Sequence, residues 1–423
     1  MTPELKGFIL LSVVKMILVF TVIMVGVALL TLMERKVSAW MQNRRGPNRV
    51  GWAGLLQPAA DGLKNILKEE TYPALASPWL FVLAPALSFI PALLLSGVIP
   101  FAAPLPVNFD FTLGPLGAFS YHGDLPMVVA DLPIGFLFVL AISSLGVYGI
   151  ALAGWSSNSK YALLGGLRAS AQMISYEVAM GLSLIPVLLM SGNVSFTTII
   201  RDQQAGLWYV LPLFLSFFIF LISGFAETNR LPFDLPEAES ELIAGYHTEY
   251  SAMKFSFFFI AEYANVVTVC AMVTTLFFGG WSIPFVSVGS GHPGALLTLE
   301  PGVLATVLTL LAFFLKLMFW IFFVMWIRWT LPRFRYDQLM ALGWKVLMPL
   351  ALAYIMVICT AIYGIEHVAG ITEPKPRALA LFGVNVVLGL LIFGLLDRGV
   401  FIKGSNRRQQ TSKALAKRAT VTG

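Results

Sequence analysis

The chain is poor in charge. Lys, Arg, Asp and Glu together make up 12% of its 423 residues, whereas 58% are hydrophobic and the mean hydropathy is +0.81. A soluble domain carries about 25% charged residues, so this chain has too little polar surface to face water on all sides. A membrane protein is therefore expected. Because its apolar runs are continuous and do not alternate, the spans are expected to be helices and not barrel strands.

Cysteine and histidine are scarce as well. The two cysteines, Cys270 and Cys359, lie far apart in apolar stretches, and the four histidines are scattered. Neither an iron–sulfur cluster nor a haem attachment site can be assembled from such a set, and we expect no metal. A GxGxxG pattern at 289–294 follows no strand and opens no helix, so it does not predict a nucleotide or flavin site. We therefore expect this chain to carry no electrons itself.

The apolar stretches divide the chain into about nine candidate spans, each close to the ~20 residues with which a helix crosses ~30 Å of hydrocarbon. They lie at about 8–33, 79–100, 125–153, 170–190, 207–226, 253–281, 302–327, 343–365 and 378–396. Lys and Arg are concentrated in every second loop between the spans. The remaining loops and the N-terminal segment hold only Lys6, Arg201, Lys375 and Arg377. This asymmetry predicts an all-α polytopic membrane protein with its N-terminus outside and its C-terminus inside.

A single transmembrane domain, 1–400, follows from this pattern. Its inside loops 34–78 and 227–252 are the most polar and are expected to form one functional side, with an amphipathic interfacial helix in each. Residues 401–423 form a basic tail, which we expect to be cytoplasmic and disordered. The net charge of +6 reflects this inside bias and calls for no nucleic-acid partner.

The first inside loop, 34–78, has the pattern of a structured surface. Arg44, Arg45 and Arg49 flank a Gly-Pro-Asn turn, and apolar residues at helical spacing follow over 55–67. An amphipathic helix lying in the membrane interface is expected there. Its basic flank fits either anionic lipid or a fixed protein partner, and the rigid turn between the arginines favours the partner.

The fifth loop, 227–252, is acidic, which is unusual beside an anionic inner leaflet. A lone Arg230 accompanies Glu227, Asp234, Glu237, Glu239, Glu241 and Glu249. Asp234 and Glu237 have the spacing of a capping box that opens a helix, which is the simpler interpretation of Glu237. Glu237 and Glu241 would then share one helix face, where like charges repel. Partly buried, such carboxylates hold protons near neutral pH, as a proton relay requires.

Ionisable residues also lie within the predicted spans. Asp131, Glu177, Glu262 and Lys316 would each cost about 3 kcal/mol if they faced lipid unpaired, so each is expected to face protein or water. Lys316, near the middle of its span, is the expected counter-charge for one of the carboxylates. A structural ion pair is the alternative for any single residue, but acids outnumber bases, which favours a relay for the set.

Two functions fit these observations. One is a membrane subunit of a redox-driven pump, which holds an amphipathic electron acceptor near the inside face and passes energy to a chain of carboxylates. The other is a secondary ion transporter, which is expected to show two similar halves with paired broken helices. No internal repeat is visible, and the polarity is concentrated in the inside loops, so the pump subunit is favoured. A passive anchor for a soluble enzyme would not explain the buried acids.

The chain resembles the family of the H subunit of bacterial NADH-quinone oxidoreductase (respiratory complex I), which is equivalent to mitochondrial subunit 1. The resemblance is carried by MERKVSAWMQNRRGPNRVGWAGLLQPAADGLKNILKEE, GWSSNSKYALLGGLRASAQMISYE, AETNRLPFDLPEAESELIAGYHTEY and RWTLPRFRYDQLMALGWK. It extends over about residues 8–365. The ninth span and the basic tail belong to the less characteristic end.

The resemblance implies a membrane-arm subunit of a proton-translocating enzyme in the bacterial cytoplasmic (inner) membrane. Its partners would be membrane lipid and other subunits, which would carry the flavin and clusters, and its bound substrate a quinone (ubiquinone or menaquinone). A ferredoxin-linked plastoquinone reductase and a membrane-bound hydrogenase are related alternatives. An acid that some relatives carry in the third span, near Ser143 and Ser144, is missing here.

The resemblance also implies roles for particular residues. The quinone chamber and the interface with the peripheral arm would include Arg35, Arg44, Arg45, Asp61, Arg335 and Asp337, to which we add Arg230 of the acidic loop. The proton relay would include Glu177, Glu227, Glu262 and the loop residues Glu237, Glu239 and Glu241. We add Asp234 and Lys316 to this relay from their positions.

Overall fold

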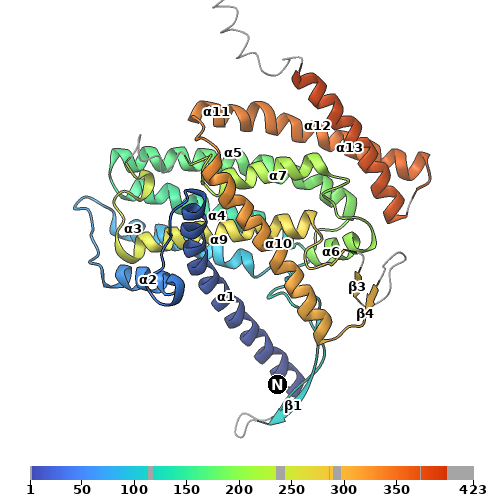
Figure 1. Ribbon diagram of the computed structural model, residues 1–423, viewed down its shortest axis with the longest axis horizontal. Helices are drawn as coiled ribbons and strands as arrows, with labels where there is room; N and C mark the ends of the chain where they lie inside the picture. Colours follow the sequence, from blue (N-terminus) through green and yellow to red (C-terminus); the bar gives the residue numbers. More distant parts are fainter. Residues whose placement is uncertain are drawn as a thin grey trace, which may run out of the picture.

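The computed structural model describes residues 2–112, 118–234, 243–284, 286–288, 297–371 and 373–397. Helices dominate this part of the chain (Figure 1). Their bounds are α1 Pro3–Met41, α2 Gln57–Leu67, α3 Pro78–Ser96, α4 Gly135–Ser156, α5 Lys160–Ser191, α6 Phe196–Ala205, α7 Phe214–Glu227, α9 Ala252–Phe277, α10 Val303–Thr330, α11 Tyr336–Ala341, α12 Met348–Tyr363 and α13 Pro374–Asp397. Short helical turns cover Trp52–Gly54, Gly245–His247, Leu342–Leu347 and Gly364–Val368.

The all-α polytopic membrane architecture is confirmed. Within the described ranges, 8 helical stretches are long and apolar enough to cross a membrane: α1, α3, α4, α5, α9, α10, the continuous run from α11 through α12, and α13. The expected span at 207–226 is shorter, because α7 is helical only over Phe214–Glu227. Pro212 accounts for this late start, since the residue before a proline disfavours helical geometry. The count of nine spans and their orientation stay predictions.

The interfacial helix of the first loop is present as α2. Its Leu63, Ile66 and Leu67 are exposed on one apolar face, as expected for a helix that lies on a membrane or a partner. The helix predicted in the fifth loop falls mainly on 235–242, which lie outside the described residues. The chain on either side of them is irregular over 228–234 and 243–251, apart from a short helical turn at Gly245–His247.

Two small sheets occur that the sequence patterns did not lead us to expect. Strands β1 Leu105–Thr112 and β2 Ala118–Leu125 form an antiparallel hairpin, with Leu105 opposite Leu125. Strands β3 Val286–Val288 and β4 Leu297–Leu299 pair in parallel. The hairpin packs on the outer end of α1, where Gly7 leaves room for the carbonyl of Ser120 (Figure 1). The alternating polar and apolar residues over 107–112 are the sequence signal of β1.

Helix α5 is central to the packing of the bundle. It contacts α4, α7 and α12, and Gln172 and Tyr176 on its inner side are fully buried. Tyr176 donates to the Leu339 carbonyl of α11 at 2.8 Å. The segment that follows α7 and the first half of α9 carry a group of charged residues, among them Arg230 and Glu262.

Candidate functional site

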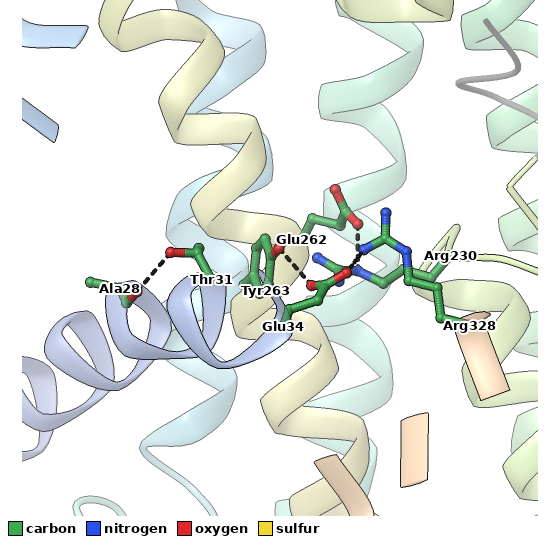
Figure 2. Close-up of polar contacts among 7 residues, drawn as sticks. All are labelled: Ala28, Thr31, Glu34, Arg230, Glu262, Tyr263 and Arg328. Atoms are coloured by element: carbon green, nitrogen blue, oxygen red, sulfur yellow. Dashed lines mark hydrogen bonds and ion pairs between the residues drawn. The ribbon is translucent and has the colours of Figure 1, made fainter. Parts of the chain in front are cut away.

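A buried carboxylate on α1 is the centre of a charged cluster. Glu34, only 5% exposed, directly follows the long apolar part of α1. Its Oε2 accepts from Arg230 Nη1 at 2.8 Å and from the Tyr263 hydroxyl at 2.7 Å, and its Oε1 pairs with Arg328 of α10 (Figure 2). Charge-assisted hydrogen bonds of this kind are the strongest in proteins, so Glu34 ties together α1, α9, α10 and the segment after α7.

Arg230 occupies the middle of this cluster. Its guanidinium is 3% exposed, and besides Glu34 it pairs through Nε with Glu262 Oε1 of α9 at 2.6 Å. The same guanidinium lies over the Tyr263 ring, 3.9 Å from its centroid, a favourable cation–π position. Figure 2 shows the two carboxylates on either side of the arginine. Two guanidinium groups thus balance two carboxylates in a water-poor interior, as buried charges require.

The backbone that carries Arg230 is held by α5. Gln172 Nε2 donates to the carbonyls of Ala226 and Phe233, each at 2.8 Å, and to Asn229 Oδ1 at 3.2 Å. Asn229 itself has a left-handed backbone with φ of 52°, a conformation that asparagine tolerates better than most residues. One buried amide therefore fixes the turn that delivers Arg230 to both of its carboxylates.

Asp234 forms a second ion pair next to the cluster. It is 8% exposed, and its Oδ2 accepts from Arg333 Nη2 at 2.9 Å. Burial raises the pKa of Asp234 to about 6, although the Arg333 guanidinium acts in the opposite direction. The charge of Glu262 also reaches Asp234 and favours its protonated form. Asp234 therefore changes charge within a pH range where most aspartates stay ionised.

Glu227 lies apart from the arginines. Its Oε2 is buried without a hydrogen-bond partner among the described residues, and it feels the charge of Glu177 on α5. A small cavity beside it is lined by polar groups of Ser143, Asn265 and Thr268 as well as by apolar side chains. A carboxylate with one free oxygen beside a cavity that holds several polar side chains is chemically able to take up and release a proton.

The residues predicted for the quinone side lie mostly on the surface. Arg35 pairs with Asp61 of α2 at 2.6 Å, with both side chains partly exposed. Arg44 donates to Gln42 at 2.6 Å, and Arg45, Arg335 and Asp337 are exposed. The structure thus brings Arg35 and Asp61 together and leaves the other four on the surface. Arg230 is instead buried with the relay residue Glu262.

Lys316, one of the predicted relay residues, forms no ion pair with a carboxylate of the described residues, and its role as a counter-charge stays a prediction. Its ammonium instead donates to the carbonyls of Phe278, Gly280 and Ser282, because a helical turn of α10 directs it at the end of α9. The other relay residues Glu237, Glu239 and Glu241 lie outside the described residues. Within the described ranges, no group of three or more His, Cys, Asp or Glu side chains could hold a metal ion.

Three members of the cluster were missed by the sequence analysis: Glu34, Tyr263 and Arg328. Glu34 was counted only as part of the charged end of the first span, and Arg328 only as an inside positive charge. A weak signal existed, since Glu34 is the sole acid among the basic residues of that stretch and Tyr263 directly follows Glu262. Their contacts join residues 196 to 294 positions apart, which no local pattern predicts.

Known proteins are similar to this chain over the region that holds the cluster. The sequence profile of the NADH dehydrogenase family matches residues 14–359. The second H subunit of NADH-quinone oxidoreductase from Koribacter versatilis is 52% identical over 354 residues, which are 83% of this chain and 96% of that protein. The second H subunit of NADH-quinone oxidoreductase from Geobacter metallireducens is 50% identical over 345 residues, 82% of this chain and 93% of that protein.

A eukaryotic protein is equally similar. NADH-ubiquinone oxidoreductase chain 1 of Chondrus crispus is 50% identical over 351 residues, 83% of this chain and 96% of that protein. The matched residues 14–359 include the whole buried cluster, whereas α13 lies beyond them. The similarity therefore covers the part of the chain that carries the candidate site.

Proposed function

The chain belongs to the NADH dehydrogenase family, and from this premise we propose that it is the membrane-arm subunit of a proton-translocating NADH-quinone oxidoreductase. In this role it lines the quinone chamber at the junction with the peripheral arm. It couples quinone reduction to proton movement through its buried carboxylates. Its substrate is a quinone, ubiquinone or menaquinone, its partners are the other subunits of the complex, and its location is the bacterial cytoplasmic membrane.

One observation carries this proposal: the buried Arg230 pairs with both Glu34 and Glu262, and the partly unpaired Glu227 lies three residues before it. Charges inside a membrane protein are costly and mark ion pathways or proton relays. Here four elements converge on the two paired acids, while Oε2 of Glu227 has no hydrogen-bond partner among the described residues. A passive anchor has no use for such an arrangement.

The coupling follows from the positions of the charges. Asp234 lies next to the inner surface and responds to the charge of Glu262, and Glu262 shares Arg230 with Glu34. A proton taken from Asp234 or the acidic loop for quinone reduction changes the field at Glu262 and Arg230. Glu227 and Glu177 then adjust their protonation, since each feels the charge of its neighbours. In this account the loop residues Glu237, Glu239 and Glu241 form the quinone-side end of the relay.

The inner surface supplies the second part of the function. Arg35 and Asp61 fix α2 against α1 through their 2.6 Å ion pair. Arg44, Arg45, Arg335 and Asp337 are exposed on this side and are proposed to contact the peripheral-arm subunits. The apolar face of α2 would then border the passage by which a lipid-soluble quinone enters from the membrane.

Glu227→Gln tests this function, with Glu373→Gln as the matched control at an exposed carboxylate. Both variants are compared with the wild type for inhibitor-sensitive quinone reduction and for protons pumped per electron in membrane vesicles. Native gels verify assembly. We expect Glu227→Gln to assemble and to lose activity and pumping about tenfold or more, the scale on which removal of a proton-transfer group acts. Glu373→Gln should match the wild type. Unchanged pumping per electron in Glu227→Gln would refute the relay.

A further inference from the structure

Lys316 is held by backbone carbonyls. Its Nζ donates to the carbonyl oxygens of Phe278 at 2.7 Å, Gly280 at 2.9 Å and Ser282 at 2.6 Å. An ammonium group has three N–H donors and no acceptor, so all three donors are used. The Nζ atom also lies 4.3 Å from the centroid of the Trp208 ring.

The three carbonyls belong to a turn built for this geometry. Phe278 ends α9, and Gly279 and Gly280 follow with φ of 70° and 54°, a left-handed conformation that glycine adopts without strain. A Cβ atom on Gly279 would lie 2.2 Å from the Ser282 hydroxyl oxygen. This backbone turns alternate carbonyls inward. They also lie at the negative end of the α9 dipole, which attracts a cation.

Neighbouring side chains make the turn rigid. Gln203 of α6 accepts from the Gly279 amide at 2.9 Å and donates to the Thr275 carbonyl at 2.9 Å. The Trp208 indole donates to the Ser282 hydroxyl at 3.2 Å. These contacts help to hold the turn in place, and Lys316 supplies three more. A rigid ring of backbone carbonyls with an aromatic face is a cation-binding arrangement.

Among the described residues, no group in hydrogen-bond contact with the Lys316 ammonium can accept a proton from it. Its three hydrogen-bond partners are amide carbonyls, which do not take up protons near neutral pH, and no ion pair joins it to a carboxylate of the described residues. A relay residue needs a titrating neighbour. The contacts instead resemble those of a cation that is held permanently in a binding site.

We propose that the 278–282 turn is a binding site for a small primary ammonium ion, which this chain occupies with its own Lys316. The side chain thereby locks the end of α9 to α10 and takes no part in moving protons. This inference does not depend on the proposed function, because it concerns occupancy of the site and the stability of the turn. It removes Lys316 from the predicted relay.

Two lysine variants of the assembled complex test the site. Lys316→Ala empties it, and Lys15→Ala is the matched control, because Lys15 is also within an apolar helix but meets a single carbonyl, that of Pro126 at 3.0 Å. Amide hydrogen exchange of the 278–282 segment is measured by mass spectrometry, which needs no turnover. Each sample is measured with n-propylammonium chloride and with tetramethylammonium chloride at equal ionic strength. The second ion has the charge but lacks N–H donors.

Lys316→Ala is expected to speed exchange of this segment about tenfold or more, because hydrogen bonds to a charged group are lost. Propylammonium should return the rate to within about twofold of wild type, and tetramethylammonium should not. Lys15→Ala should leave the segment unchanged. Lys316→Met, which keeps the stem and removes only the donors, should also speed exchange but without rescue. If the Lys316→Ala variant does not accumulate, Lys316→Met is compared with the wild type in its place.

Other outcomes overturn the proposal. Wild-type exchange in both Lys316 variants would mean that the ammonium does not hold the turn. Equal rescue by both salts would show an ionic-strength effect without a site. Reduced protons per electron in Lys316→Met, with exchange of the turn unchanged, would return Lys316 to the relay. If only the Glu227→Gln test fails, the proposal for Lys316 is unaffected, because amide hydrogen exchange of the turn is measured without quinone.

Discussion

Arg230 and Glu262 are joined inside the protein by an ion pair of 2.6 Å between Nε and Oε1. The arginine follows α7 and the glutamate lies on α9, and the same guanidinium reaches Glu34 of α1 through Nη1 at 2.8 Å. One guanidinium is therefore paired with two acids, and Arg328 supplies the second positive charge that balances them. These contacts link three parts of the chain.

Loss of Arg230 is expected to be severe. Arg230→Met should lower the free energy of unfolding by about 3–5 kcal/mol, because removal of one partner leaves buried charges uncompensated. Arg230→Lys should recover only part of this, since an ammonium lacks the two-edged fork. Thermal unfolding in detergent and the yield of complex on native gels measure the effect. Arg201→Met, at an exposed arginine outside the proposed interface, serves as the control and should stay within about 0.5 kcal/mol. Wild-type stability of Arg230→Met would contradict the role given to the cluster.

The Tyr263 hydroxyl should be coupled to Glu34. Tyr263→Phe removes the 2.7 Å hydrogen bond but keeps the ring under Arg230, so a loss of about 1.5–3 kcal/mol is expected. In Glu34→Gln the acceptor is no longer charged, and the added effect of Tyr263→Phe should be smaller. A double-mutant cycle of thermal stabilities measures this coupling. Strictly additive losses would show that the two groups do not interact.

Asp234 should make stability depend on pH in a defined direction. Its pKa in the folded chain is raised to about 6 from an ordinary value of 3.8. Between about pH 4 and 6 the folded state therefore binds more protons at this site than the unfolded state does, and stability falls as pH rises. Above about pH 6 this contribution is constant. The difference in thermal stability between wild type and Asp234→Asn, followed from pH 4 to 8, should show this slope. A rising or flat difference would exclude the raised pKa.

The contact of α3 with α4 gives a matched pair of glycine variants. A Cβ on Gly149 would meet Ser88 Oγ at 2.2 Å and the Ala84 carbonyl oxygen at 2.9 Å, whereas a Cβ on Gly146 meets nothing within 4 Å. Gly149→Ala is therefore expected to cost about 1–3 kcal/mol through overpacking. Gly146→Ala should be neutral or stabilising by up to about 1 kcal/mol. Thermal unfolding of the two variants measures the contrast. Equal effects would mean that the helices are not in close contact at Gly149.

Most of the architecture was predictable because it depends on local properties. Membrane helices follow from runs of apolar residues, and α2 follows from the spacing of Leu63, Ile66 and Leu67 around one face. The short α7 was overestimated, since hydropathy does not register that the chain before Pro212 is irregular. The β1–β2 hairpin was missed in a loop that was interpreted only from its lack of Lys and Arg. Alternation of side chains over 107–112 was the better guide to it.

The candidate site was predictable only in part. Glu262 and Glu177 stood out because a charge in an apolar span needs an explanation. Lys316 stood out for the same reason, yet it proved to bind backbone carbonyls, which composition cannot reveal. Glu34 and Arg328 did not stand out, because charged residues are ordinary at the inner ends of membrane helices.

The sequence by itself determined that this chain is a helical membrane protein, where its apolar helices lie, and to which family it is similar. These properties follow from hydrophobicity and from motifs of adjacent residues, and both can be recognised one segment at a time. Only the tertiary structure decided which charges meet. Glu34 and Arg230 are 196 positions apart, and their contact depends on how α1, α5, α9 and α10 pack. In a medium of low dielectric constant two charges about 4 Å apart interact many times more strongly than in water, so the energy of each charge depends on which residues the packing brings beside it.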